Sequence, residues 1–298
     1  MRIVLTGSSG RIGRAIFGAL ASVHEVIGCD RMPFATTHIT GDIADEALLQ
    51  RVMEGADAVI HTAGLHAPHV GHVPDREFER INVEGTARIG EIARACGVGL
   101  IVFTSTTALY GTAVAEGDCT WIDENIIPQP QSVYHRTKIA AEAILPELAT
   151  DRFVVRVLRM ARCFPQSADL MAAYRLHRGI DARDVADAHA LALAHTGAPF
   201  ERVILSGATP FSRVDCDMLA VDAAAVIRDR SPALAEAFDA RGWPLPRSID
   251  RVYDPSSAEE KLGWRSRYGF DEVLAQLDRR SAEILPLGVQ SPSSERAE

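Results

Sequence analysis

Short apolar runs of strand length alternate with longer segments of helical periodicity through the first two-thirds of the chain. The short runs are rich in Val, Ile and Leu and show little polar alternation, which is typical of parallel strands that helices cover on both faces. The predicted strands are 2–6, 24–29, 38–40, 58–62, 100–104 and 153–158, and the predicted helices among them are 12–21, 44–53, 76–95 and 133–149. This alternation predicts an α/β fold with a Rossmann-type, doubly wound parallel sheet.

The pattern is looser after residue 159. It predicts helices at 184–195, 216–228, 232–240 and 270–280 and one strand at 202–205. We expect residues 1–160, together with 183–206, to form the sheet and its flanking helices, and residues 161–182 and 207–286 to form a small interleaved cap. Residues 287–298 have no apolar period, so we expect a disordered tail there.

Charge and composition narrow the range of partners. The chain has 31 Lys and Arg against 40 Asp and Glu, a formal net charge of −9, which argues against binding to a nucleic-acid backbone. A hydrophobic fraction of 47% is typical of a soluble globular protein. The apolar runs are too short to cross a membrane, no secretory leader is recognised, and the five cysteines form no C-x-x-C pair. We therefore expect a cytoplasmic protein with reduced thiols.

A glycine-rich turn, TGSSGRIG at residues 6–13, follows the first predicted strand and opens the first helix. Gly7 permits a tight turn, Gly10 lets the backbone approach a pyrophosphate, and Gly13 allows close packing of helix and strand. The N–H groups at the start of the helix are suitable donors for the phosphates. The residues expected to line this dinucleotide site are Gly7, Ser9, Gly10, Arg11, Ile12 and Gly13.

The second and third predicted strands each end beside a carboxylate. Asp30 can accept hydrogen bonds from both ribose hydroxyls and repel a 2′-phosphate, so it favours NAD over NADP. Arg31 and Arg11 are basic groups that could hold a 2′-phosphate, which keeps NADP as the less favoured alternative. Asp42 and Ile43 are expected beside the adenine, and an equally compatible interpretation makes Asp42 the N-cap of helix 44–53.

Tyr134 and Lys138 lie four residues apart in a predicted helix, so their side chains share one face. A phenol has a pKa of roughly 10, and a neighbouring cation favours its phenolate. A surface helix pair is the alternative. The segment FTSTTALYG at 103–111 favours a site, because hydroxyls at the carboxyl end of a parallel strand face the crevice in which open α/β sheets bind ligands.

Several motifs occur in an order that resembles the extended short-chain dehydrogenase/reductase family, the NAD-dependent epimerase/dehydratase group. They are the glycine turn, DAVIHTAG at 57–64, NVEGT at 82–86, the hydroxyl-rich strand ending in Tyr110-Gly111, the Tyr-x-x-x-Lys pair and LGW at 262–264. The resemblance implies that Tyr134 is the general base or acid, Lys138 its pKa partner and a nicotinamide-ribose ligand, and Thr106 the third catalytic hydroxyl. It also implies that Thr62, Ala63, Gly64 and Asn82 belong to the cofactor site.

The region after the sixth predicted strand departs from the nucleotide-sugar enzymes of this family. RMARCFP at 159–165 lacks their Asn-x-Tyr-Gly-Pro-like turn, and only residues 166–179 precede the family-like IDARDVA segment. The short insert favours a small substrate without a nucleotide. Arg162 is the best candidate for holding a carboxylate or phosphate of that substrate. Arg175, His177 and Arg178 add cationic character, unless they pair with Asp169 or Asp181 or lie in solvent.

Two further loops are candidates for contact with the substrate. His66 and Thr107 follow predicted strands and are expected to contact it. The histidines at 66, 69 and 72 suggest a zinc site, but the loop contains Pro and Gly and falls where the resemblance implies a substrate loop, so no metal is expected. Residues 121–124 are interpreted as a lid or, equally, as a solvated connection.

Together these features predict an NAD-dependent oxidoreductase that acts on a hydroxyl or keto group of a small sugar-like or hydroxy-acid substrate. The alternatives are a sugar or nucleotide-sugar epimerase or dehydratase with transient hydride transfer, and a non-catalytic NAD sensor. The resemblance also implies a homodimer formed through segments 76–95 and 134–149.

Overall fold

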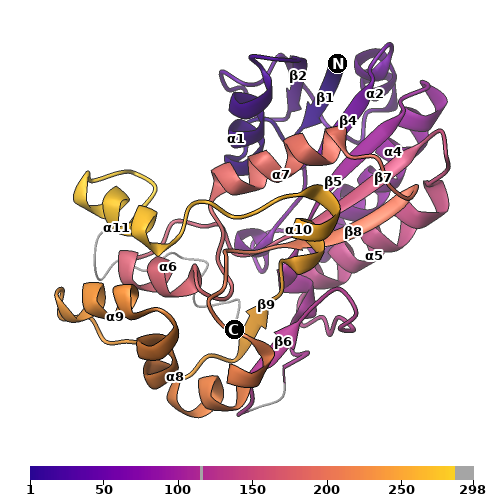
Figure 1. The fold of residues 1–298 in the computed structure, drawn as a ribbon. Coiled ribbons are helices and arrows are strands. Elements are labelled where there is room, and N and C mark those ends of the chain that lie inside the picture. Colours follow the sequence, from indigo (N-terminus) through magenta and orange to yellow (C-terminus); the bar gives the residue numbers. More distant parts are fainter. Residues whose placement is uncertain (115–116, 286–298) are drawn as a thin grey trace.

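A seven-stranded, fully parallel sheet forms the centre of the computed structural model, which describes residues 1–114 and 117–285 (Figure 1). Its strands, in the spatial order β3-β2-β1-β4-β5-β7-β8, are β1 (Arg2–Thr6), β2 (Glu25–Asp30), β3 (Ile39–Thr40), β4 (Ala58–His61), β5 (Leu100–Thr106), β7 (Val154–Met160) and β8 (Phe200–Leu205). The predicted doubly wound α/β fold is confirmed.

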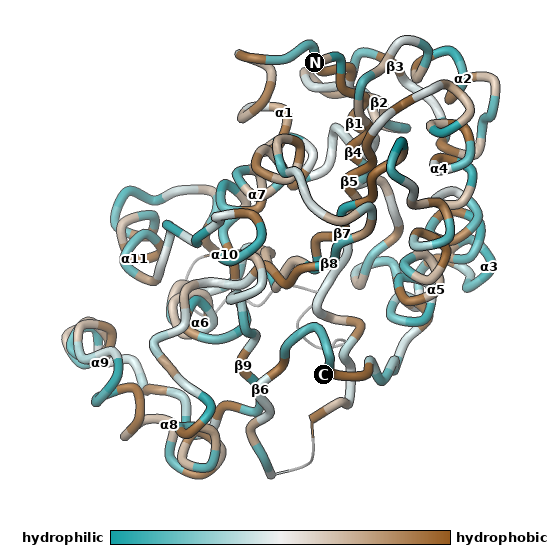
Figure 2. Tube along the Cα trace, turned by 45° about the vertical axis from the view of Figure 1, so that its right-hand side comes forward, coloured by the Kyte–Doolittle hydropathy of each residue, from teal (hydrophilic) through white to brown (hydrophobic). Residues whose placement is uncertain are grey.

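Helices cover both faces of this sheet. One layer contains α1 (Arg11–Leu20), α7 (Ala182–Ala194) and α10 (Ser256–Leu262), and the other contains α2 (Glu46–Met53), α4 (Gly85–Ala95) and α5 (Val133–Leu148). Successive residues of a strand point to opposite faces, so Ile3 and Leu5 pack in the first layer and Val4 in the second. The central strands are therefore mainly apolar, as the hydropathy colouring of Figure 2 shows.

The predicted helix 76–95 is present, but a π-helical turn lies within it. It consists of α3 (Asp75–Phe78), the π-helical turn η2 (Glu79–Glu84) and α4. The π-helical turn contains Asn82, whose side chain is buried. Such turns occur often at functional sites, but hydrophobic periodicity does not reveal them.

A smaller lobe lies beside the carboxyl edge of the sheet (Figure 1). It contains α6 (Ala168–Tyr174), α8 (Cys216–Arg230), α9 (Pro232–Asp239), α11 (Phe270–Asp278) and the two-stranded parallel sheet of β6 (Thr120–Ile122) and β9 (Arg251–Tyr253). Leu219, Ile227, Phe238 and Val252 belong to its own apolar cluster. Three short 3₁₀ segments complete the elements: η1 (Ala67–His69), η3 (Thr107–Tyr110) and η4 (Arg213–Asp215). The domain boundaries given above stay a prediction, and the expected tail 287–298 lies outside the described residues.

The expected lid at residues 121–124 is wrong. Trp121 lies in β6 and donates a hydrogen bond from Nε1 to Asp254 Oδ2 at 2.7 Å, and Glu124 Oε1 accepts one from Ile204 N at 2.7 Å. These contacts fix the segment between the small sheet and β8, and none of its four residues lines the site cavity described below.

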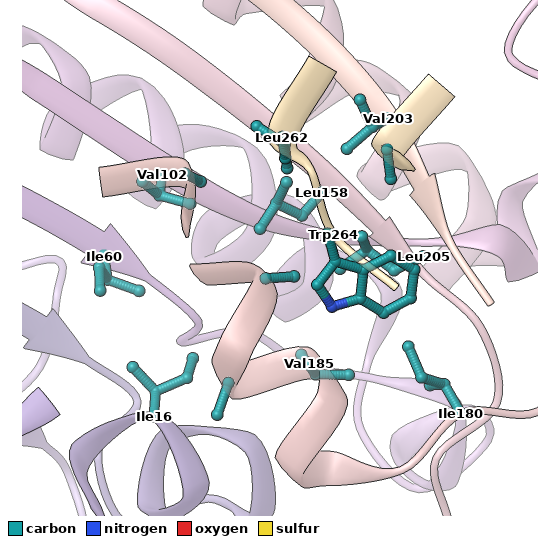
Figure 3. Close-up of a cluster of buried hydrophobic side chains, with 14 of the residues drawn as sticks. Ile16, Ile60, Val102, Leu158, Ile180, Val185, Val203, Leu205, Leu262 and Trp264 are labelled. Carbon is teal, nitrogen blue, oxygen red and sulfur yellow. The ribbon is translucent and has the colours of Figure 1, made fainter. Parts of the chain in front are cut away.

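The LGW segment, residues 262–264, packs against the main sheet and helix α7. Gly263 ends α10 with φ +65°, a left-handed conformation that favours glycine. Trp264 follows it, is 1% exposed and packs among residues such as Val185 and Leu205 (Figure 3). Its indole Nε1 donates to Asp184 O at 2.9 Å. Across the described part of the chain, the helices are all too short or too polar to span a membrane.

Candidate active site

A cavity of about 790 Å³ lies at the carboxyl ends of β1, β4, β5 and β7, where parallel α/β sheets usually bind ligands. Residues of both the sheet and the smaller lobe line it. The predicted site residues that line it are Gly7, Ser9, Gly10, Arg11, Ile12, Gly13, Asp30, Asp42, Ile43, Thr62, Ala63, Gly64, His66, Thr106, Thr107, Tyr134, Lys138 and Arg162. Asn82, which was predicted for the cofactor site, does not line it.

The glycine turn has the shape of a phosphate cradle. Gly7 has φ +75°, and its N–H donates to Cys29 O at 2.9 Å. A Cβ on Gly13 would lie 2.1 Å from Gly7 O, so only glycine allows this approach of helix and strand. Helix α1 starts after Gly10 with no side-chain cap and no acidic residue in its first turn. Its N-terminal amides and positive dipole end are therefore suited to a pyrophosphate.

Asp30 orders the turn at the end of β2. Its Oδ2 accepts from Ser9 N at 3.0 Å and its Oδ1 from Met32 N at 2.9 Å. Arg31 beside it also lines the cavity. Arg11 instead forms an ion pair with Glu283 of the C-terminal segment, a partner that the sequence did not suggest. The possibility that Arg11 is held ready for a 2′-phosphate is therefore not supported by its contacts.

Asp42 is not the N-cap of the second helix. Helix α2 starts at Glu46, and its N-cap is Asp45, whose side chain accepts from Leu48 N at 3.0 Å. Asp42 accepts from Ala44 N at 2.9 Å and from Arg80 Nη2 at 3.2 Å. These hydrogen bonds and the charge of Arg80 outweigh burial and lower the pKa of Asp42.

Asn82 supports the cavity wall from behind. Its Oδ1 accepts from Leu65 N at 2.8 Å, and its Nδ2 donates to Leu65 O at 2.9 Å and to Thr137 Oγ1 at 3.1 Å. A Cβ on Gly64 would lie 3.1 Å from Asn82 Oδ1. The amide therefore ties the loop after β4 to helix α5, which carries Tyr134.

Thr106, Tyr134 and Lys138 meet at one end of the cavity. Burial raises the pKa of Tyr134 to about 12, and its hydrogen bond with Thr106 opposes that shift. Thr106 is the last residue of β5, and its Oγ1 also accepts from Ala108 N at 3.1 Å. The predicted threonine and tyrosine are therefore joined directly.

Lys138 is held against the end of β5. Its Nζ donates to Thr104 O at 2.9 Å and lies 3.9 Å from the centre of the Phe103 ring. Burial lowers the pKa of Lys138 to about 7, and the negative charge of Glu142 opposes that shift. The Lys138 ammonium group thus contacts strand β5. Both Lys138 and Tyr134 line the cavity.

Behind Lys138 is a buried ionic network that sequence reasoning missed. Glu142 Oε2 lies 2.7 Å from Arg159 Nη2 and 3.0 Å from Arg202 Nε, and Glu142 Oε1 accepts from Ser105 Oγ. Arg159 Nη1 also donates to Tyr110 Oη at 2.8 Å. The available signal was Glu142, four residues after Lys138 on the buried helix face, together with arginines inside two apolar strands.

Two buried histidines support the same strand ends. His61 lies between Thr6 Oγ1 at 2.8 Å and Thr86 Oγ1 at 3.0 Å, and His189 Nε2 lies 2.7 Å from Thr104 Oγ1. Burial lowers the pKa of His61 to about 3 and that of His189 to about 4. Both are therefore neutral near pH 7.

The substrate candidates His66, Thr107 and Arg162 line the same cavity. His66 stacks on Phe164 with the ring centres 5.7 Å apart. Thr107 O accepts from Tyr253 Oη at 3.3 Å, and Arg162 Nε donates to Gln166 Oε1 at 2.9 Å. Within residues 1–114 and 117–285, no group of three or more His, Cys, Asp or Glu is arranged to hold a metal ion.

The predicted cationic cluster divides into two parts. Arg175 and His177 do not line the cavity. Arg175 forms an ion pair with the buried Asp181 at 3.1 Å, and His177 Nδ1 lies 2.9 Å from Arg251 O. Arg178 does line the cavity, together with Arg251, which sequence reasoning missed because β9 has only three residues.

Comparisons with known proteins agree with the sequence motifs. A family model described as "NAD dependent epimerase/dehydratase family" matches residues 3–166, more than half of the chain. Uronate dehydrogenase from Pseudomonas putida is 30% identical over 181 residues, 57% of this chain and 63% of that protein. L-arabinose 1-dehydrogenase (NAD(P)(+)) from Haloferax volcanii is 30% identical over 171 residues, 53% of this chain and 65% of that protein. The matches thus span less than two thirds of either relative.

The structure is similar to UDP-glucose 4-epimerase from Bifidobacterium longum, solved in complex with NAD⁺ and UDP. The TM-score is 0.66 at 20% sequence identity, and the match covers 94% of this chain and 99% of that one. At this identity the likeness concerns the fold. The family resemblance inferred from the motifs is confirmed by the family model, and the chain belongs to the NAD dependent epimerase/dehydratase family.

Proposed function

We propose that this chain is an NAD-dependent dehydrogenase that interconverts a hydroxyl and a keto group on a small sugar-like or hydroxy-acid substrate. The observation that carries the proposal is the joint placement of Thr106, Tyr134 and Lys138 in the cavity that also contains the glycine cradle. The similarity to uronate and L-arabinose dehydrogenases supports it.

The residues present fit NAD. The α1 amides after Gly10 would hold the pyrophosphate, Asp30 the adenosine ribose, and Ile43 the adenine face. Lys138 would bind the nicotinamide ribose. Asp30 favours NAD over NADP, because a second anion beside its carboxylate is repelled. When bound, NAD supplies the acceptor or donor of a hydride.

The chain's own side chains transfer the proton of the substrate hydroxyl. Tyr134 Oη takes the proton of the substrate hydroxyl during oxidation and returns it during reduction. Thr106 Oγ1, already hydrogen-bonded to that phenol, orients the hydroxyl. Because burial holds the pKa of Tyr134 high, ionisation requires a nearby cation, and Lys138 is the ammonium that faces the same cavity.

The compact lobe favours a small substrate. Between the end of β7 and the start of α7, the chain contains one short helix, α6, and no longer insert. The test is a screen for net NADH formation with aldoses, uronates, polyols and hydroxy acids. A dehydrogenase should form NADH and purify largely without cofactor. Protein that keeps stoichiometric NAD and only interconverts epimers would replace this proposal with the epimerase alternative.

We also propose a cytoplasmic homodimer. Helices α4 and α5 pack side by side, and Ala143 on α5 is exposed. The family resemblance implies that such a pair meets its copy in a partner subunit. Light scattering should then give twice the chain mass of 32.3 kDa, and Ala143→Arg should halve the measured mass.

A further inference from the structure

The segment that follows helix α11, residues 281–285, is fixed against the start of the smaller lobe. Arg280 has φ +54°, a left-handed conformation that turns the chain back toward α6. Leu285 N then donates to Gln166 O at 2.9 Å, and the Ile284 side chain is buried in the apolar cluster of the lobe. The backbone of this segment therefore has a defined position.

The same segment places a carboxylate beside the glycine cradle. Glu283 forms an ion pair with Arg11 Nη1, and Arg11 is the first residue of helix α1. The Arg11 guanidinium also donates a hydrogen bond to the Cys163 sulfur, in the loop after β7. Arg11 thus joins three segments that are distant in the sequence: the cradle, the loop after β7 and the C-terminal segment.

Arg11 also lines the cavity in which the cofactor would bind. It directly follows Gly10, at the end of α1 whose amides are suited to a pyrophosphate. Each phosphate of that group carries a negative charge and is a good partner for a guanidinium. Within the described residues, the buried Arg11 Nε has no hydrogen-bond partner, so the side chain keeps a donor for a cofactor oxygen. Glu283 and the cofactor phosphates are therefore two anions beside one cation.

The ion pair of Arg11 with Glu283 is partly open to solvent. The Arg11 side chain is 24% exposed and that of Glu283 is 49% exposed. A pair with this exposure contributes little net free energy, so the Glu283 carboxylate can rotate into solvent when a phosphate binds. While the pair is formed, it neutralises Arg11 and weakens the attraction between the cradle and the pyrophosphate.

A dehydrogenase benefits from such a competing carboxylate. It has to exchange its cofactor after every turnover, whereas an epimerase recovers the oxidised cofactor within one turnover and can retain it. An anion that takes over the Arg11 cation when the cofactor leaves favours this exchange.

We propose that Glu283 is a positioning residue that speeds cofactor release, because its carboxylate competes with the cofactor phosphates for Arg11. This inference rests on the proposed NAD-dependent dehydrogenase function and gives a role to a residue that does not itself line the cavity. Removal of the Glu283 charge should strengthen cofactor binding, whereas a variant that only loosened the fold would weaken it.

The experiment measures NADH release from the full chain by stopped-flow fluorescence and NAD affinity by calorimetric titration. Glu283→Gln should release NADH about 3-fold more slowly and bind NAD correspondingly tighter, a change within the range of a partly exposed ion pair. Glu283→Asp, which keeps the charge on a shorter side chain, should lie between this variant and the wild type. The difference should shrink at high ionic strength, because salt screens exposed charges. Unchanged or faster release from Glu283→Gln would overturn the proposal.

A double-mutant cycle tests the route through Arg11. Arg11→Gln should weaken NAD binding, and Glu283→Gln should have no further effect on release in that background, because the shared cation is gone. Equal slowing in both backgrounds would show that Glu283 acts without Arg11 and would overturn the proposal. Glu25→Gln is the matched control, since it removes the same charge from an exposed ion pair with Arg2 outside the cavity. Release from Glu25→Gln should equal that of the wild type, and a similar slowing there would reduce the effect to net charge and contradict the proposal.

Failure of this inference differs from failure of the proposed function. If the chain binds neither NAD nor NADH, the proposed function fails, and the inference fails with it. If NADH forms with a sugar but leaves wild type and Glu283→Gln at the same rate, the dehydrogenase function stands and only the role of Glu283 is refuted.

Discussion

Glu142 and Arg159 form a buried, bidentate ion pair that joins helix α5 to strand β7. Arg159 Nε lies 3.0 Å from Glu142 Oε1, Arg159 Nη2 lies 2.7 Å from Oε2, and both side chains are at most 4% exposed. Glu142 is one helical turn beyond Lys138, so this pair fixes the helix that presents Tyr134 and Lys138 to the cavity.

Replacing Glu142 should therefore destabilise the protein. Glu142→Gln leaves the buried Arg159 and the half-buried Arg202 without this counter-charge, and breaking a buried pair typically costs about 3–5 kcal/mol. Urea unfolding measures the difference. Asp239→Asn is the matched control, because it breaks an exposed pair with Arg228 and should change stability little. Equal losses in the two variants would contradict the role given to the buried network.

Tyr134→Phe should abolish turnover and leave NAD binding largely intact. Loss of a positioned general base typically lowers the rate by a factor of about 10²–10⁴. Steady-state kinetics and NAD titration measure the two effects. Tyr268→Phe is the control, since Tyr268 stacks with Arg183 and does not line the cavity. Undiminished activity in Tyr134→Phe would remove this residue from the mechanism.

Two glycines of helix α1 offer a matched pair. Gly13→Ala would place its Cβ 2.1 Å from Gly7 O, so it should distort the cradle, weaken NAD binding and destabilise the fold by about 1–3 kcal/mol. Gly18→Ala meets nothing within 4 Å and should stabilise the helix by about 0.5–1 kcal/mol. Calorimetric NAD titration and unfolding curves check both. Normal NAD affinity in Gly13→Ala would show that this turn does not hold the cofactor.

The buried histidines predict a loss of stability in acid. His61, His177 and His189 have folded-state pKa values lowered by burial to about 3, 3 and 4, below the unfolded value near 6.5. Unfolding therefore takes up protons below about pH 6.5, and each histidine contributes up to about 1.4 kcal/mol of lost stability per pH unit. His189→Gln should flatten the decline in the free energy of unfolding between about pH 6.5 and about pH 4. An unchanged slope would show that His189 is not neutral in the folded state.

Asp30 should determine the choice between cofactors. Asp30→Asn keeps an acceptor for the Ser9 amide but removes the charge that repels a 2′-phosphate. Titrations with NAD and NADP should show the preference for NAD falling or reversing, and Arg31 nearby is available to hold the phosphate. A wild type that prefers NADP would contradict the role of Asp30.

The sheet and the glycine cradle could be predicted because local sequence determines them. Apolar runs buried on both faces, and glycines required by close backbone contact, leave signals within a few residues. The short elements β6 and β9 could not be predicted, because the pairing of residues 120–122 with 251–253 depends on contacts between distant segments. For the same reason, the ion pair of Arg11 with Glu283 and the position of Arg251 on the cavity wall appear only in three dimensions.

The most direct test of the proposed function is net NADH formation by the purified protein with excess NAD and a panel of aldoses, uronates and sugar phosphates. The account predicts more than one NADH per protein chain with at least one substrate, dependent on Tyr134. Tightly retained NAD with no net NADH, accompanied by interconversion of sugar epimers, would contradict it.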